Sequence, residues 1–126
     1  MTTRIANFET VGKDTSKNAF AALLATKENN ILRDSFIYIN PEQGDSKRLM
    51  MGYTIIYPAC RSNGHEHGDR EEAYYVTRGK GVMVIDGEEF TVSAGDCFYV
   101  PFGKFHTIRN PHNEPLEYVW AIAIDR

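Results

Sequence analysis

Short stretches of apolar and β-branched residues alternate with turn-forming residues along the second half of this 126-residue chain. The pair Asp86-Gly87 is the strongest of these turn signals, because both residues tolerate the positive φ angles of a two-residue hairpin loop. Gly95 and Pro101 bound a further short stretch, and a proline at that place ends a strand. Many short strands at even spacing predict an all-β chain that folds as a small antiparallel sandwich or barrel.

The predicted strands belong to a single domain, residues 1–126, with an N-terminal arm. They cover residues 35–40, 49–57, 73–77, 82–85, 90–92, 97–100, 106–109 and 116–124. The stretch 49–57 is nearly all apolar, so we expect both of its faces to be buried. Residues 1–30 form the arm, in which the composition of 16–25 favours a short helix, although tertiary packing can turn so short a stretch into a strand. No linker divides the chain, and its length supplies one core.

Charge and composition exclude several classes of partner. The net charge is −3 and the basic residues are scattered, so we expect no binding to nucleic acid. No apolar run approaches the roughly 20 residues that span a bilayer. The N-terminus lacks the apolar core of a signal peptide, so we expect a cytoplasmic protein with no membrane partner. In that compartment Cys60 and Cys97 are expected to be free thiols.

Two histidines with one residue between them, His65 and His67, are the first candidate metal ligands. Side chains of a strand repeat with a period of two, so both imidazoles point to the same face, and such a pair suits a divalent transition metal. Glu71 and Glu72 follow a turn, and either could supply a carboxylate. The pattern puts them on opposite faces of a strand and does not say which face looks inward.

A third histidine, His106, follows a bend at Pro101 and Gly103. This bend aims the histidine side chain back into the barrel. A His-x-His pair alone is a weak signal, but together with a nearby carboxylate and this third histidine it predicts one metal site built by two segments of the chain.

The spacing of these residues resembles the two motifs of the cupin superfamily. The first cupin motif reads G-x5-H-x-H-x3,4-E-x6-G, and the second reads G-x5-P-x-G-x2-H-x3-N. The residues that fit the first motif are His65, His67, Glu72 and Gly79, and those that fit the second are Gly95, Pro101, Gly103, His106 and Asn110. The motifs cover about residues 59–79 and 95–110. Ala59 stands where the first motif opens with glycine, which affects only the loop shape expected there.

This resemblance implies an antiparallel jelly-roll β-barrel of six to eight strands with a metal ion in its mouth. The ligands that it implies are His65, His67, Glu72 and His106. Glu72 is favoured over Glu71 because it has the motif's spacing to Gly79. Asn110 would have a structural role at the end of its strand.

Three histidines and one glutamate would leave two open positions on an octahedral ion, and Mn, Fe, Co, Ni and Zn all accept such ligands. The ion would polarise and orient a small substrate with two neighbouring oxygens, such as a sugar, a keto acid or an enolisable carbonyl compound. Tyr74 shares the face of Glu72, so it is a candidate substrate contact or proton-transfer group unless it serves packing alone; Glu72 itself could move a proton if it left the metal. Tyr53 is a second candidate contact, although it and Trp120 more often belong to the core.

Three functions from different classes fit such a site. The first is an isomerase, lyase or cyclase that uses the metal as a Lewis acid; the second is an Fe(II)-dependent dioxygenase; the third is a non-enzymatic barrel that binds a small ligand. A homodimer is expected, because the stretches 35–40 and 49–57 would leave exposed apolar edges in a single barrel. The motifs indicate metal binding rather than a particular reaction.

Overall fold

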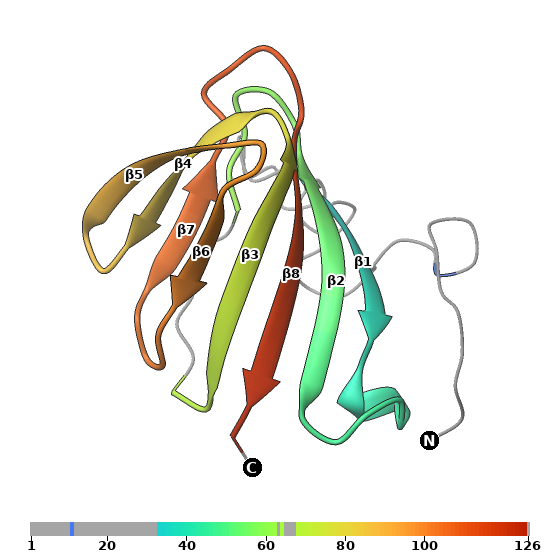
Figure 1. Cartoon of the computed structure of the whole chain (residues 1–126). Helices are drawn as coiled ribbons and strands as arrows, with labels where there is room; N and C mark the ends of the chain where they lie inside the picture. Colours follow the sequence, from blue (N-terminus) through green and yellow to red (C-terminus); the bar gives the residue numbers. More distant parts are fainter. Residues whose placement is uncertain (1–10, 12–32, 63, 65–67, 126) are drawn as a thin grey trace.

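The computed structural model describes residues 11, 33–62, 64 and 68–125. Eight strands in this part of the chain form two antiparallel sheets that face each other across one core (Figure 1). The predicted all-β, antiparallel fold is therefore confirmed. The helix predicted at 16–25 lies outside the described residues, and so do His65 and His67.

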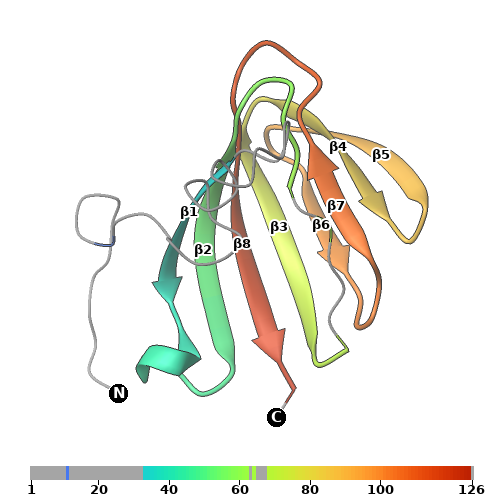
Figure 2. The same cartoon turned by 180° about the vertical axis from the view of Figure 1, so that it is seen from behind.

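The chain returns at its end to the middle of the larger sheet, whose strand order is β1-β2-β8-β3-β6 (Figure 2). These strands are β1 (Arg33–Ile39), β2 (Leu49–Ile56), β3 (Arg70–Arg78), β6 (Cys97–Val100) and β8 (Leu116–Ile124). The smaller sheet has the order β5-β4-β7 and contains β4 (Lys80–Ile85), β5 (Glu88–Ser93) and β7 (His106–Arg109). A single 3₁₀ turn, η1 (Pro41–Gln43), lies between β1 and β2.

The strands begin and end close to the predicted residues. The bounds of β6, β7 and β8 are those predicted, whereas β3 begins earlier, at Arg70, and thus takes in Glu72. Asp86 (φ 51°) and Gly87 (φ 86°) form the two-residue loop between β4 and β5, as their tolerance of positive φ predicted.

Alternate residues of β8 point into the space between the sheets and form the centre of the core. They are Leu116, Tyr118, Trp120, Ile122 and Ile124, and all five are buried. Met83 and Ile108 meet them from the smaller sheet and are 0% and 2% exposed. Burial of one such aliphatic side chain contributes about 1.5–3 kcal/mol, so this alternation is a main reason why the two sheets pack face to face.

The strand β2 corrects the expectation that residues 49–57 are buried on both faces. Gly52, Thr54 and Ile56 point inward and are buried, whereas the residues between them are only partly buried and Leu49 is 46% exposed. The smaller sheet covers one face of the larger sheet, so apolar composition alone overstated the burial of the other face.

Gly52 is required by the packing of the single tryptophan. A Cβ atom at this position would come within 2.2 Å of Cζ2 of Trp120 and 2.6 Å of the backbone oxygen of Phe36. The indole therefore occupies the space that any other side chain at residue 52 would need, and its Nε1 donates to Oγ1 of Thr54 at 2.9 Å.

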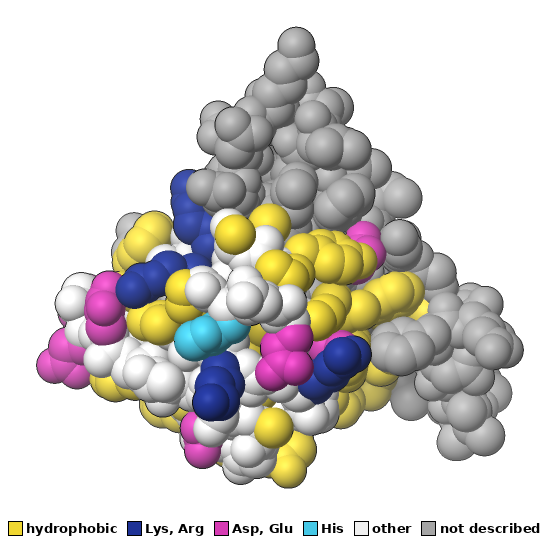
Figure 3. All heavy atoms as spheres, turned by 90° about the horizontal axis from the view of Figure 1, so that it is seen from above, with side chains coloured by type: hydrophobic (Ala, Val, Ile, Leu, Met, Phe, Trp, Pro, Cys, Tyr) yellow, Lys and Arg dark blue, Asp and Glu magenta, His cyan; other side chains and the backbone are white. Residues whose placement is uncertain are grey.

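One end of the barrel is closed around Asn110, and we call it the Asn110 end; it consists of the loops at residues 57–60 and 110–115. The buried Asn110 amide donates to the carbonyls of Ile56 (3.0 Å) and Glu114 (2.7 Å), and its oxygen accepts from the backbone N–H of His112 (3.0 Å). These bonds tie the 110–115 loop together and join it to the end of β2, which fits the structural role expected for this residue. Seen from this end, charged side chains of both signs are interspersed with hydrophobic ones (Figure 3).

The loop at the Asn110 end contains a residue in an unfavourable backbone conformation. Ala59 has a φ angle of 63°, in the left-handed region that favours glycine. This is the position where the first cupin motif has glycine, so the backbone there keeps the shape that glycine would adopt more easily.

Neither cysteine forms a disulfide: Cys60 is buried and Cys97 is exposed, and both are free thiols, as predicted. The described residues contain no helix long and apolar enough to cross a bilayer.

Candidate metal centre

Glu72 and His106 meet inside the barrel, at the end opposite Asn110, where β3 and β7 begin; we call it the His106 end. The imidazole Nε2 of His106 lies 3.1 Å from the carboxylate Oε2 of Glu72. Both residues are almost completely buried: His106 is 2% exposed and Glu72 is 5% exposed. The two predicted ligands on separate strands are thus brought together, and Glu71, on the other face of β3, instead accepts a hydrogen bond from Tyr99 at 2.9 Å.

The loop before β7 sets the orientation of the His106 ring. Gly103 in this loop has a φ of 72°, and the carbonyl of Phe105 accepts a hydrogen bond from the backbone N–H of Asp86 at 2.8 Å. Nδ1 of His106 lies 3.1 Å from the backbone carbonyl of Lys104. Because a carbonyl can only accept, Nδ1 carries a proton and Nε2 faces the barrel interior.

The facing atoms of the pair need a positive charge between or upon them. Oε2 of an ionised Glu72 is an acceptor, and so is Nε2 of a His106 ring whose proton is on Nδ1. Two acceptors at 3.1 Å are stable only if a proton or a metal cation lies between them. Two ligand atoms at right angles on a metal, with bonds of about 2.1 Å, are about 3.0 Å apart, so the residues fit a divalent transition metal.

Without a metal, a proton on Nε2 can take this role. Burial by itself would lower the pKa of His106, but the hydrogen bond and negative charge of Glu72 and the carbonyl of Lys104 favour the charged ring. Their combined effect raises the pKa of His106 above its usual value of 6.5.

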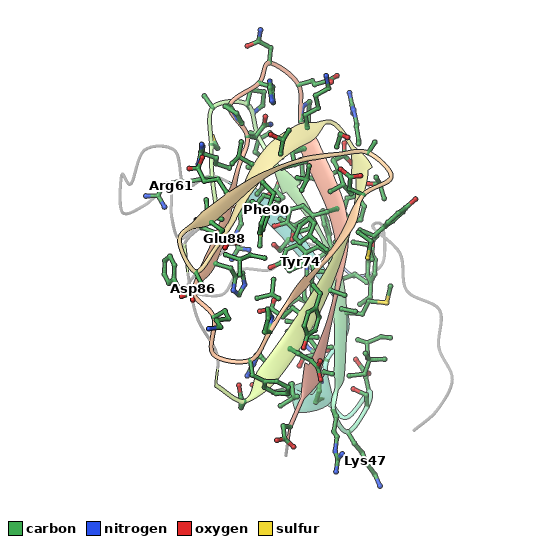
Figure 4. All side chains as sticks on the ribbon, turned by 60° about the vertical axis from the view of Figure 1, so that its left-hand side comes forward. Lys47, Arg61, Tyr74, Asp86, Glu88 and Phe90 are labelled. Carbon is green, nitrogen blue, oxygen red and sulfur yellow. The ribbon has the colours of Figure 1, made fainter. Side chains whose placement is uncertain are left out.

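Tyr74 lies beside the pair, as its shared face with Glu72 predicted. Its hydroxyl donates to Oε1 of Glu72 at 3.3 Å, and its ring stacks on Phe98 with centroids 4.9 Å apart. Burial, followed by the charge of Glu72, raises the pKa of Tyr74 well above 10.0, so at neutral pH the hydroxyl keeps its proton. Figure 4 shows this side chain within the barrel, whereas the labelled Arg61 points outward. Tyr74 therefore both packs in the core and orients the carboxylate.

Tyr53, the other predicted substrate contact, is not brought to this site. It lies on the outer face of the larger sheet, where its hydroxyl donates to Glu117 and lies 3.3 Å from Oγ1 of Thr77. Its neighbours across the sheet, Val119 and then Tyr75, share that outer face. The strand register thus places Tyr53 on the opposite side of the sheet from Tyr74.

The chain that leads to His65 runs beside β7. The backbone N–H of Ser62 donates to the carbonyl of Ile108 at 2.8 Å, and Oγ of Ser62 accepts from the N–H of Ile108 at 3.0 Å. Gly64 lies against Phe105, whose ring would be only 2.4 Å from a Cβ at residue 64. Within the described part of the chain no three potential ligands gather at one point, and the two remaining predicted ligands lie outside it.

Sequence reasoning missed the residues that flank the site on the larger sheet. Tyr118 is fully buried with its ring centroid 5.0 Å from that of Tyr74, and burial raises its pKa to about 12. Arg33, at the start of β1, contributes a positive charge near both tyrosines. The only sequence signal for Arg33 was the alternation along β1. That alternation points to the interior only once the pairing of β1 with β2 is known, and this pairing is not visible in the sequence.

A separate pocket of about 190 Å³ lies on the surface of the Asn110 end. Its lining consists of Ala59, Cys60, Arg61, Arg109, Asn110 and Pro111. Neither residue of the Glu72–His106 pair contributes to it, so this pocket and the candidate metal centre are distinct.

Comparisons with known proteins agree with the observed fold. The family model described as Cupin domain matches residues 52–122. An uncharacterized protein of Methanocaldococcus jannaschii is 32% identical over 92 residues, which cover 73% of this chain and 71% of the relative. An oxalate-binding protein of Thermotoga maritima is 33% identical over 86 residues, 68% of this chain and 71% of the relative. Among solved structures, a predicted oxalate decarboxylase from Thermotoga maritima has a TM-score of 0.77 at 20% identity and covers 96% of this chain and 99% of its own, a likeness of fold alone.

Proposed function

The chain belongs to the cupin family, and we propose that it binds one divalent transition metal and uses it to bind and transform a small, oxygen-rich acid. The proposed ligands are His65, His67, Glu72 and His106. The observation that carries the proposal is the buried pair of Glu72 and His106, whose facing atoms are 3.1 Å apart and can be satisfied by a proton or by a bound metal ion.

The connectivity of the chain supports the two ligands outside the described residues. His65 and His67 follow Gly64, which lies against the loop before β7, and they precede β3 by a few residues. Because β7 carries His106 and β3 carries Glu72, the two histidines are joined at both ends to the elements that hold the pair.

The residues around the pair would prepare it for binding. A bound divalent ion would supply a Lewis acid that polarises an oxygen of the substrate. The Lys104 carbonyl fixes the ring of His106, and the Tyr74 hydroxyl fixes the carboxylate of Glu72; such outer contacts typically raise metal affinity about 10- to 100-fold. Tyr74 holds its proton at neutral pH, so its chemical role is that of a hydrogen-bond donor or acid rather than a base.

The relative named for oxalate binding supports a small acid as the ligand. Oxalate presents two neighbouring oxygens, the arrangement that would fill two adjacent positions on a metal. The same relative favours a second candidate function, a barrel that binds a small acid without transforming it. Turnover of a bound acid separates the two.

The first test is elemental analysis of protein purified without a metal-chelating column. We expect about one equivalent of a transition metal in the wild type and little in His106→Ala. The exposed loop residue His112 supplies a matched control, so His112→Ala is expected to retain the metal. No metal in the wild type after reconstitution with Mn, Fe, Co, Ni and Zn would rule the proposal out.

We also propose that the protein is a homodimer. β1 forms an edge of the larger sheet, and Tyr75 and Tyr99 on its outer face are 50% and 53% exposed. An association that covers this face would bury aromatic surface. Light scattering that gives the monomer mass at micromolar concentration would contradict it.

A further inference from the structure

The inner face of the larger sheet becomes polar toward its β1 edge. Oγ of Ser35 and Oγ1 of Thr54 are 2.9 Å apart, and Thr54 also accepts a hydrogen bond from Trp120. Ser35 and Thr54 are paired across the strands and are both buried, at 5% and 0% exposure. Burial of polar groups costs free energy unless hydrogen bonds compensate, and these two hydroxyls bond to each other.

Arg33 adds a charge to this lining. It pairs with Ile56 in the register of β1 and β2, and period two places it on the same face as Ser35. Its Nε is buried and has no hydrogen-bond partner within the part of the chain that the structure describes. The ion pairs of the described residues likewise do not include this guanidinium. The guanidinium hydrogen-bonds to Tyr118 but has no carboxylate partner among the described residues, so its positive charge is left without an anion there.

Two tyrosines link this guanidinium to the candidate metal centre. Arg33 lies near the hydroxyl of Tyr118, and the ring centroid of Tyr118 is 5.0 Å from that of Tyr74. The Tyr74 hydroxyl in turn donates to Glu72 at 3.3 Å. The positive charge and the proposed metal centre therefore border the same aromatic cluster inside one barrel.

We propose that Arg33 binds a carboxylate of the ligand, so that the ligand is a small dicarboxylic acid whose other end meets the metal. This inference rests on the proposed function for the metal end of the ligand. A carboxylate is the natural partner of a guanidinium, which binds it through two parallel hydrogen bonds. Arg33 is only partly buried as a whole residue, so its guanidinium is not completely enclosed by the described residues.

The test compares acids that differ only in the second carboxylate. The probes are 2-oxoglutarate, 2-oxoadipate and 2-oxopimelate, each beside the 2-oxo monocarboxylic acid of equal chain length. They are titrated into the manganese-loaded protein without oxygen, and binding is followed by the fluorescence of Trp120, the only tryptophan. We expect the best-fitting dicarboxylate to bind about 10- to 100-fold more tightly than its monocarboxylate in the wild type.

Three variants assign that preference to its source. Arg33→Met keeps an unbranched apolar stem without the charge and is expected to bind both acids of a pair equally, at the affinity of the wild type for the monocarboxylate. Arg33→Lys keeps the charge without the fork and is expected to retain part of the preference. Arg78→Met removes an exposed arginine paired with Glu117 and should behave as the wild type. An unchanged preference in Arg33→Met, or no preference in the wild type at any chain length, would overturn the inference.

A further titration distinguishes failure of the Arg33 inference from failure of the proposed metal binding. If the protein takes up no metal, succinate, glutarate and adipate are titrated into the metal-free wild type and both Arg33 variants. Binding that Arg33→Met abolishes and Arg33→Lys partly keeps would support the anion site alone, and no binding by the wild type would reject it. If Arg33→Met does not give the circular dichroism spectrum of the wild type, the comparison uses Arg33→Lys, for which an unchanged preference and an unchanged salt dependence would count against the inference.

Discussion

The two ends of the barrel treat buried polar side chains in different ways. At the Asn110 end, the amide of Asn110 bonds to backbone groups of Ile56, Glu114 and His112. At the His106 end, the side chains of His106 and Glu72 face each other, and each is fixed from behind by a further group. The first arrangement joins loops and completes its own hydrogen bonding. The second presents two good metal ligands to one point. Metal binding requires this arrangement, whereas the stability of the fold does not.

This difference leads to four predictions, given from the largest expected effect to the smallest. Changes at the Asn110 end should alter the free energy of unfolding, and changes at the His106 end should alter the affinity for a metal. A variant at the Asn110 end that lowered metal affinity, or one at the His106 end that mainly lowered the free energy of unfolding, would weaken the comparison.

Asn110→Ala is expected to lower the free energy of unfolding by about 3–5 kcal/mol, because it leaves two buried carbonyls without their donors and removes the bond to His112. Urea unfolding measures the change. Asn113→Ala makes the same substitution in the exposed part of the loop and should stay within about 0.5 kcal/mol of the wild type. If Asn110→Ala lowered the free energy of unfolding by less than about 1 kcal/mol, the Asn110 amide would not be the main link between the 110–115 loop and the end of β2.

Glu72→Gln is expected to lower metal affinity at least about 100-fold, since a neutral amide replaces a charged ligand. A chelator competition assay with cobalt or zinc measures it. The metal-free variant should lose less unfolding free energy than Asn110→Ala, because glutamine keeps the shape and can still bond to Tyr74. Glu71→Gln, on the outer face beside Tyr99, is the control that should bind metal normally. Equal affinities in the two variants would show that Glu72 is not a ligand.

Alkaline pH should affect the tyrosines that lie between the two ends. Burial raises the pKa of Tyr118 to about 12, whereas in the unfolded chain it is near 10.0. The unfolded state therefore loses this proton first, so stability is unaffected below pH 10 and falls as the pH rises toward 12. Urea unfolding at pH 11 should show a loss of about 1.4 kcal/mol from this group. The loss should be smaller in Tyr118→Phe, and an identical pH dependence in that variant would contradict the assignment.

Ala59→Gly should stabilise the Asn110 end slightly, by about 0.5–1 kcal/mol. Relief of the positive φ of 63° outweighs the extra freedom of glycine in the unfolded chain. Ala94→Gly, in an exposed turn where alanine is not strained, should be destabilising by a similar amount. The melting temperatures of the two variants should therefore shift in opposite directions, and a shift in the same direction would remove the strain argument.

Local signals predicted much of the fold. The Asp86-Gly87 loop, the alternation of β8 and the bounds of β6 and β7 all follow from turn chemistry and period-two patterning over neighbouring residues. These features are local, so the sequence contains all the information that they need. The resemblance to the cupin motifs, rather than a local pattern, predicted that Glu72 and His106 would meet.

The sequence by itself determined where the strands lie and which residues share a face; only the tertiary structure decided which face is inside. Period two divides β3 into a set with Glu72 and a set with Glu71, and it divides β1 and β2 in the same way. The smaller sheet packs on one side of the larger one, and that contact made Glu72 and Tyr74 internal, Tyr53 external and Arg33 part of the interior face. Pairing between strands far apart in the chain sets this choice, and no local pattern encodes it.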